Sequence, residues 1–175
     1  MEKWQEDLFF KAQLFAIEAH NSVNQFYDKT KPYSFHLEMV YNFGNNYAHL
    51  LPNDESRLYA LSACWTHDLI EDTRLTYNDV RQALGGPIAE ITYALTNEKG
   101  RNRKERANDK YYEGIRNTPL ATFVKLCDRL ANVSYSKQQG SSMLNAYRKD
   151  QAYFVEQLSM NGCKPMFEEL ETLLA

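Results

Sequence analysis

The sequence predicts an all-α protein, a helical bundle of roughly eight to ten helices forming one domain over residues 1–175. Only 7 glycines and 5 prolines occur in 175 residues, whereas average usage would supply about 21. So few turn-forming residues indicate helices joined by short loops. No segment has the alternating apolar pattern of a convincing strand. Apolar residues make up 43% and charged residues 25% of the chain, which is ordinary for a protein of this length with a buried core.

The first three predicted helices follow from apolar periodicity and from proline. The first runs from about residue 4 to 27 and ends before Pro32, because proline does not fit inside a helix. The second begins near Ser34 and continues to about Leu50. Pro52-Asn53-Asp54 predicts the start of the third, which runs to about Asp72.

Capping signals predict the remaining helices. Serine, threonine and asparagine cap helix starts with their side chains, and proline suits the first turn. These helices are a short one from the Thr76–Asp79 capping box to Gly85-Gly86, one from Pro87 to about Asn97, one from Thr118-Pro119 to about Tyr135, and two near 142–160 and 165–174.

Composition also limits the class of protein. No apolar run approaches the about 18 residues of a membrane span, and the N-terminus lacks a signal-peptide core, so no membrane association is expected. Three cysteines without CxxC spacing argue against a disulfide framework and predict a cytoplasmic protein. A net charge of −3 and a pI of about 5.8 disfavour nucleic-acid binding. No feature predicts an oligomeric state.

Four ionisable residues close the third predicted helix. At about 100° per residue, Asp68, Glu71 and Asp72 lie about 100°, 40° and 140° from His67, on one arc. This arc continues the apolar face of the same helix, which carries Trp65. Burying three carboxylates beside an imidazole is costly unless a cation holds them. A frayed, exposed helix end is the alternative.

Two other metal-competent side chains interrupt apolar stripes. His36 shares its predicted helical face with Met39 and Val40, and Asp128 shares its face with Val124 and Ala131. Taken alone, His36 would be a satisfied core histidine, and Asp128 would pair with a neighbouring arginine.

Together with His67 and Asp68, these two residues form a set of two histidines and two aspartates on three helices. Such a set leaves coordination positions open on a divalent metal, as catalysis requires. Imidazole and carboxylate ligands accept Mn²⁺, Fe²⁺ or Zn²⁺. The pattern favours a metal-dependent hydrolase.

These residues resemble the H…HD…D signature of HD-superfamily phosphohydrolases. The closer likeness is to the hydrolase domain of RelA/SpoT-type enzymes, whose motifs read roughly AH, PYxxHP, HDxxEDT and KLADRxxN. The matching segments are Ala19-His20, Pro32 to His36, His67 to Thr73 and Lys125 to Asn132. The HDxxEDT element is the specific one, because generic HD proteins lack the following Glu-Asp pair. The likeness runs from about residue 12 through the last helix, and a stand-alone small alarmone hydrolase is therefore expected.

The resemblance implies one Mn²⁺ ion and a nucleotide substrate, (p)ppGpp, whose 3′-pyrophosphate is hydrolysed to give GDP or GTP and pyrophosphate. By position it implies that the metal ligands are His36, His67, Asp68 and Asp128. It further implies that Glu71 and Asp72 position or deprotonate the attacking water. Asn132 would lie near the nucleotide, and so would Tyr33 through its place in the Pro-Tyr-x-x-His match. His20 is expected to be a hydrogen-bonded histidine of the core or beside the ligands.

Two departures from the family pattern leave guanine specificity open. Leu37 replaces the proline that follows the first ligand, and Lys29-Thr30-Lys31 replaces an Arg-x-x-Gly segment. Lys29 and Lys31 are candidates for the missing positive charge. Residues 99–110 hold six cations, of which Arg103 and Arg106 are the candidates for substrate phosphates. A solvated face is the alternative for this charge run.

Three rival functions remain at this point. The metal site could serve another phosphorylated nucleotide, such as NADPH or a nucleoside monophosphate. The chain could be a nucleotide sensor without turnover, although the full set of ligands and carboxylates argues against that. A nucleic-acid-binding helical module is discouraged by the net charge.

Overall fold

The computed structural model describes residues 2–175, and it confirms the all-α prediction. The described residues form eleven α-helices, of which nine are longer than one turn, two 3-10 helices and one pair of two-residue strands. The elements are α1 (Lys3–Ser22), β1 (Phe26–Tyr27), β2 (Lys31–Pro32), α2 (Ser34–Asn46), η1 (Ala48–Leu50), α3 (Asp54–Thr66), α4 (Leu69–Asp72), α5 (Tyr77–Leu84), α6 (Gly86–Ala94), α7 (Arg103–Arg106), α8 (Asp109–Asn117), α9 (Ala121–Gln138), α10 (Met143–Leu158), η2 (Ser159–Asn161) and α11 (Lys164–Leu174). None of these described helices has the length and apolar character needed to cross a membrane.

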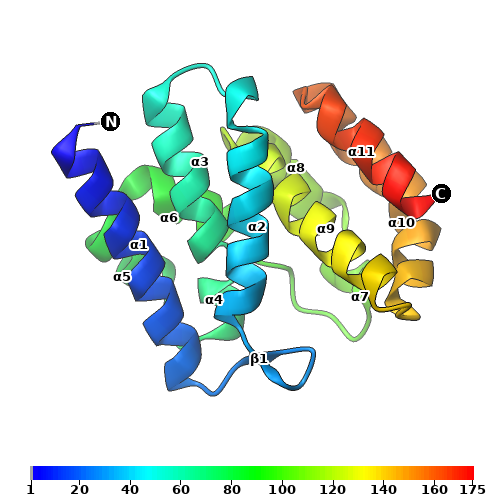
Figure 1. Ribbon diagram of the computed structural model, residues 1–175, viewed down its shortest axis with the longest axis horizontal. Helices are drawn as coiled ribbons and strands as arrows, with labels where there is room; N and C mark the ends of the chain where they lie inside the picture. Colours follow the sequence, from blue (N-terminus) through cyan, green and yellow to red (C-terminus); the bar gives the residue numbers. More distant parts are fainter. Residues whose placement is uncertain (1) are drawn as a thin grey trace.

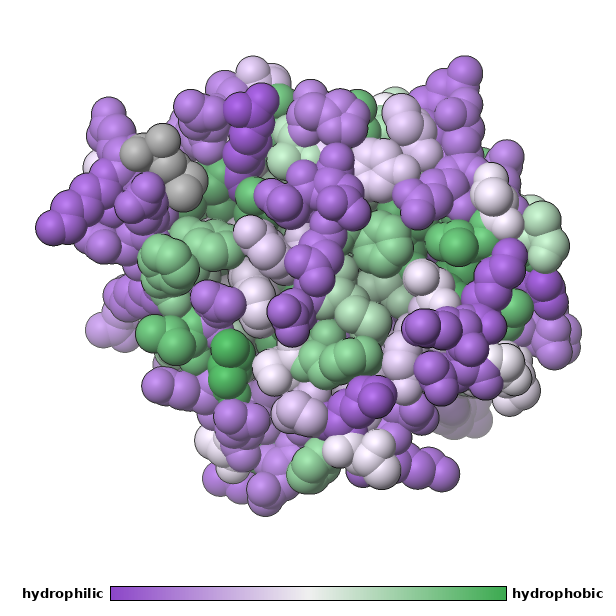
Figure 2. Space-filling model, viewed as in Figure 1, coloured by the Kyte–Doolittle hydropathy of each residue, from purple (hydrophilic) through white to green (hydrophobic). Residues whose placement is uncertain are grey.

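Helices α2, α3 and α9 form the centre of the molecule and pack against one another (Figure 1). Helix α1 covers α3 on one side, and α10 and α11 cover α9 on the other. The buried side chains fall into two clusters, one around α9 and the C-terminal helices and one between α1, α5 and α6. On the outside, α1 exposes Phe10 and Leu14, and Figure 2 shows green apolar surface over this helix. Flanking helices therefore cover the central trio on two sides.

Gly44 of α2 faces both of the other helices in the central trio. A Cβ atom built there would lie 2.9 Å from Sγ of Cys64 on α3 and 3.7 Å from Sγ of Cys127 on α9. Both cysteines are fully buried and unpaired. The missing side chain at Gly44 thus allows α2 to pack closely against α3.

A two-residue antiparallel strand pair, absent from the sequence prediction, follows α1. Phe26 pairs with Pro32, and Tyr27 pairs with Lys31. The first helix was predicted to reach residue 27 but ends at Ser22, because Asn24 adopts a left-handed conformation with φ of 53°. Two residues per strand are too few to produce a recognisable alternation.

The third predicted helix is broken at the His-Asp pair. Helix α3 ends at Thr66 and α4 begins at Leu69, with Asp68 at φ −98° and ψ 2°. The break turns Glu71 to the surface while His67 stays buried. The prediction that all four ionisable residues share one buried arc is therefore wrong for Glu71.

Several capping predictions are confirmed. The Asn53 side chain accepts a hydrogen bond from the Ser56 amide, Thr76 and Asp79 form a capping box, and a proline lies in the first turn of α6. Thr118 differs from its prediction. It does not cap α9, because its hydroxyl donates to the Gly114 carbonyl at the end of α8, a helix that the sequence did not predict.

Replacing Gly44 with alanine should destabilise the protein, although alanine is the better helix former. The added methyl group would meet a buried sulfur at 2.9 Å, and overpacking of this kind costs about 1–3 kcal/mol. Gly114→Ala is the matched control, because a Cβ there meets nothing within 4 Å. Its free energy of unfolding should rise by up to about 1 kcal/mol. Urea unfolding of both variants tests whether a side chain at Gly44 overpacks the core. Equal changes of the same sign in the two free energies of unfolding would contradict this.

Candidate active site

The four predicted ligands come together where α2, α3 and α9 meet. His36 lies in the first turn of α2, His67 and Asp68 lie at the break between α3 and α4, and Asp128 lies in the middle of α9. His36 is 1% exposed, His67 2% and Asp128 9%. The apolar stripes that surround these residues in the sequence thus carry them into the interior.

The donor atoms of this cluster converge on one point. His36 Nε2 lies 3.3 Å from Asp128 Oδ1 and 3.7 Å from Asp68 Oδ2. His67 Nε2 lies 2.9 Å from Asp68 Oδ2 and 3.7 Å from Asp128 Oδ1. One donor atom from each of His36, His67 and Asp128 lies within 4.8 Å of the others. Two imidazole nitrogens and two carboxylate oxygens are therefore close enough to share one divalent cation.

The hydrogen bonds of His67 suit a metal ligand. Its Nδ1 lies 3.0 Å from the Cys64 carbonyl oxygen, and a carbonyl can only accept, so Nδ1 carries the proton. Its Nε2 is buried and has no partner with hydrogen-bond geometry in the described chain. An oriented imidazole with one nitrogen protonated and the other directed at carboxylates is the usual arrangement around a protein-bound metal. The residues present therefore fit a divalent cation.

The electrostatics of the cluster also favour a cation. Burial lowers the pKa of His67, but Asp68 and Asp128 outweigh burial and raise that pKa well above 6.5. Burial raises the pKa of Asp128, but Lys125 and the two histidines lower it well below 3.8. The carboxylates are thus ionised and attract positive charge to this point.

Three neighbouring side chains hold the two carboxylates in place. Tyr33 donates to Asp68 Oδ2 at 2.5 Å, Asn132 Nδ2 donates to Asp128 Oδ1 at 2.6 Å, and Lys125 Nζ lies 2.9 Å from Asp128 Oδ2. Tyr33 and Asn132 were predicted at the site as nucleotide contacts. Lys125 was not, although it precedes Asp128 by three residues and therefore shares its helical face.

Glu71 and Asp72 differ in their surroundings. Glu71 is exposed, and its two carboxylate oxygens accept from the backbone amide and the side-chain amide of Asn97 at 3.0 and 2.9 Å. Asp72 is half-buried, and burial together with Asp68 and Glu71 raises its pKa to about 7. Asp72 therefore exchanges a proton near neutral pH, while Glu71 is held in a fixed position.

A cavity opens from the donor atoms toward α7 and α10. Its lining comprises Tyr33, His36, Asp68, Glu71, Asp72, Leu95, Asn97, Arg103, Arg106, Ala107, Tyr111, Tyr112, Lys125, Asp128, Arg129, Asn132 and Tyr147. Four of these residues are cations, so the lining combines a metal-competent end with a basic wall. That combination suits a phosphorylated ligand.

The cations of the basic wall are not equivalent. Arg103 and Arg129 both bind Asp150 of α10, each at 2.5 Å, and their guanidinium carbons lie 4.8 and 5.2 Å from the centre of the Tyr147 ring. Arg106 makes no ion pair with any carboxylate of residues 2–175. Arg103 thus fastens α7 to α10, and Arg106 remains free to meet an anion.

The predicted substrate residues divide into two groups. Arg103 and Arg106 line the cavity with Tyr33 and Asn132, whereas Lys29 and Lys31 are not among its lining residues. Lys31 Nζ lies 4.9 Å above the Phe35 ring. A role for the two lysines in substrate binding stays a prediction.

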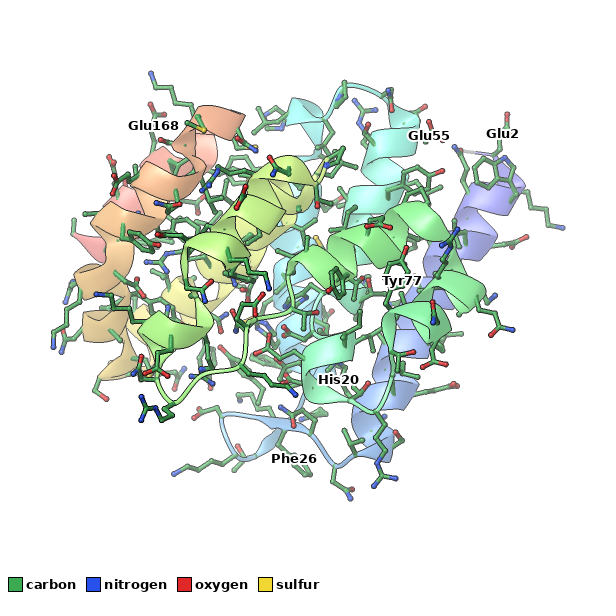
Figure 3. All side chains as sticks on the ribbon, turned by 180° about the vertical axis from the view of Figure 1, so that it is seen from behind. Glu2, His20, Phe26, Glu55, Tyr77 and Glu168 are labelled. Carbon is green, nitrogen blue, oxygen red and sulfur yellow. The ribbon has the colours of Figure 1, made fainter. Side chains whose placement is uncertain are left out.

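His20 supports the site without a hydrogen bond of its own. Its ring is fully buried and stacks on Tyr33 with centroids 4.4 Å apart, and neither ring nitrogen has a partner in residues 2–175. The expectation of a hydrogen-bonded histidine is therefore wrong. Burial lowers the pKa of His20 to about 4, so the ring is neutral and packs against Tyr33. Figure 3 shows it where α1 approaches the strand pair that carries Phe26.

Known proteins resemble this chain in sequence and in fold. No family model matches the chain. The chain is similar to guanosine-3′,5′-bis(diphosphate) 3′-pyrophosphohydrolase MESH1 of Drosophila melanogaster, with 27% identity over 95 residues, 54% of this chain and 52% of the relative. The human MESH1 is 29% identical over 76 residues, 43% of this chain and 42% of the relative. The matched region thus spans about half or less of the length of these curated relatives.

A solved structure shares the fold. It is described as a metazoan ortholog of SpoT that hydrolyses ppGpp and plays a role in starvation responses. It aligns with a TM-score of 0.70 over 95% of this chain and 93% of its own, at 22% identity. The helical arrangement of this chain is therefore that of a known phosphohydrolase.

The raised pKa of Asp72 predicts how stability depends on pH. Because the folded pKa, about 7, lies above the ordinary value of 3.8, the folded state binds this proton more tightly than the unfolded state. Asp72 therefore lowers the free energy of unfolding progressively as pH rises from about 4 to about 7, by up to about 1.4 kcal/mol per pH unit. Asp72→Asn should remove this dependence, so its stability relative to wild type should increase over that range.

Urea unfolding in EDTA at pH 5, 6, 7 and 8 measures the difference. Asp7→Asn on α1, an exposed carboxylate, serves as the control. A stability difference between Asp72→Asn and wild type that does not change with pH would contradict the assignment.

Proposed function

We propose that this chain is a Mn²⁺-dependent hydrolase that removes the 3′-pyrophosphate of (p)ppGpp to give GDP or GTP and pyrophosphate. The observation that carries the proposal is the convergence of His36, His67, Asp68 and Asp128 at one end of a cavity whose wall is basic. The likeness to enzymes named for this reaction supports it.

The metal would be held by the two histidine Nε2 atoms and by one oxygen each of Asp68 and Asp128. An ion bound there supplies a Lewis acid that withdraws charge from a phosphoryl oxygen. Tyr33, Asn132 and Lys125 keep the two aspartates oriented through the contacts described above. His36, Asp68 and Asp128 line the cavity, and a phosphate entering it would meet an ion held by these residues.

Asp72 is the proton acceptor in this proposal. A general base must lie within reach of the proton that it accepts, and Asp72 lines the cavity together with Asp68 and Glu71. Water attacks the phosphorus attached to the ribose 3′ oxygen and passes a proton to Asp72. The 3′ oxygen–phosphorus bond breaks, and the 3′ oxygen leaves as a hydroxyl by taking up the proton that Asp72 accepted, directly or through water. Glu71, fixed by Asn97, orients the entering water.

The basic wall receives the pyrophosphate. Arg106 is free of acidic partners, and Lys125 lies beside the metal-binding carboxylate of Asp128. Arg103 contributes indirectly, because its bond to Asp150 holds the segment that carries Arg106 against α10. Cations already in place around a transferred phosphoryl group stabilise the negative charge of the transition state, and the protein need not rearrange during the reaction.

Metal binding should stabilise the folded protein. Addition of Mn²⁺ at about 100 times its Kd should raise the free energy of unfolding by about 2.7 kcal/mol, which a thermal shift assay detects. His67→Gln should lose most of this shift because it removes a ligand nitrogen. His49→Gln changes an exposed histidine and should keep the full shift. Equal Mn²⁺-induced thermal shifts in the two variants would contradict the assignment of His67 as a metal ligand.

Turnover tests the reaction itself. Purified protein with Mn²⁺ should release pyrophosphate from ppGpp and form GDP, and EDTA should abolish this. Asp72→Asn should lower kcat by about 10²–10⁴-fold while retaining the Mn²⁺ thermal shift, whereas Asp7→Asn should match wild type. A protein that binds Mn²⁺ but leaves ppGpp intact would instead favour another phosphorylated nucleotide, and a panel including NADPH and nucleoside monophosphates would identify it.

A further inference from the structure

A second cavity adjoins the first one on the side of the strand pair. Its lining comprises Tyr27, Asp28, Asn132, Tyr135, Ser136, Gln139, Ser141, Met143 and Tyr147. Asn132 and Tyr147 also line the first cavity. The two hollows are therefore neighbours that share a wall, and a ligand anchored at the metal-binding end could extend from one into the other.

Two aromatic contacts connect His36 of the metal-competent cluster to residues that line this second cavity. The Tyr27 ring stacks on His36 with centroids 4.9 Å apart, and its hydroxyl donates to Asn132. The Tyr135 ring packs edge-on against Tyr27 at 5.1 Å, and its hydroxyl donates to Asp28 Oδ2 at 2.7 Å. The Asp28 carboxylate thus lies two aromatic rings away from His36.

The lining of the second cavity suits a flat base. Three tyrosines and a methionine supply apolar and aromatic surface, on which bases of any identity stack. Stacking alone does not distinguish purines, so discrimination depends on the polar groups at the edge of the cavity. Asp28 is the only carboxylic acid among the described lining residues.

A carboxylate distinguishes guanine from adenine by hydrogen-bond direction. Ionised aspartate only accepts, and its two oxygens offer about four lone-pair sites, of which the Tyr135 hydroxyl uses one. Guanine presents two adjacent donors, N1–H and the N2 amino group, on its Watson–Crick edge. Adenine presents an acceptor, N1, beside its N6 amino donor. Adenine would therefore place a lone pair against the carboxylate.

We propose that Asp28 is the residue that selects guanine over adenine, by accepting hydrogen bonds from N1–H and the N2 amino group of the substrate base. The inference rests on the proposed function, because it assumes that the phosphate end of the nucleotide lies at the metal-binding cluster. It also addresses the departure at Lys29-Thr30-Lys31, since the acceptor that reads the base stands directly before that segment.

Asp28→Asn is the decisive variant. Asp28 has φ of 48°, a left-handed conformation in which asparagine is as well accepted as aspartate, so the strand pair should survive. Asparagine keeps an acceptor for Tyr135 but presents one acceptor and one donor, which matches the edge of adenine. The ratio of kcat/KM for ppGpp to that for its adenosine analogue should fall by about 5- to 150-fold, the range expected for one bidentate base contact.

The control is Asp7→Asn, which should leave the ratio at the wild-type value. An unchanged ratio in Asp28→Asn would overturn the proposal, and so would a loss of activity that is equal for both nucleotides. In the second case Asp28 would only support Tyr135.

Direct binding separates this inference from the proposed reaction. Calorimetry with GDP and ADP measures base preference even if the protein hydrolyses neither tetraphosphate. Tighter binding of GDP by wild type, with the preference reduced or reversed in Asp28→Asn, supports the role of Asp28 whatever the reaction. Equal affinities of wild type for GDP and ADP, or binding of neither, would overturn it.

Discussion

The burial of four ionisable side chains at one point is the constraint on which the rest of this structure depends. Burying two carboxylates and two imidazoles separately would cost a large free energy. They must therefore lie where each charged or polar group meets a partner. Three helices have to meet closely for this to happen. Gly44 permits the close approach of α2 to α3. Beside it lie the sulfur atoms of two cysteines that precede site residues in sequence, Cys64 before His67 and Cys127 before Asp128.

The break between α3 and α4 follows from the same constraint. A continuous helix would place Glu71 on the buried arc with His67, and a third buried carboxylate would add cost without a partner. Ending α3 at Thr66 keeps His67 inside and lets Glu71 reach the surface, where it binds the Asn97 amide groups. The pair Glu71 and Asp72, adjacent in sequence, is thereby divided into one fixed carboxylate and one that titrates near neutral pH.

The sequence predicted the parts of this site that local pattern determines. His36 and Asp128 were recognisable because each interrupts an apolar stripe, and the helix caps at Asn53 and Thr76 were recognisable because capping uses neighbouring residues. Contacts between distant residues could not be predicted in this way. Glu71 binds Asn97 across 26 positions and Arg103 binds Asp150 across 47. The periodicity of apolar residues carries no information about which distant polar side chains meet.

The strand pair shows why such long-range contacts matter most at the substrate end. Its strands are two residues long and depend on left-handed backbone at Asp28, which no period reveals. Yet it places Tyr27 against His36 and Asp28 against Tyr135, 107 positions further along the chain. In the proposed function, the metal-dependent chemistry therefore resides in the helices, which the sequence pattern specifies. Recognition of the base, as proposed above, falls to a short segment that only the folded chain brings to the site.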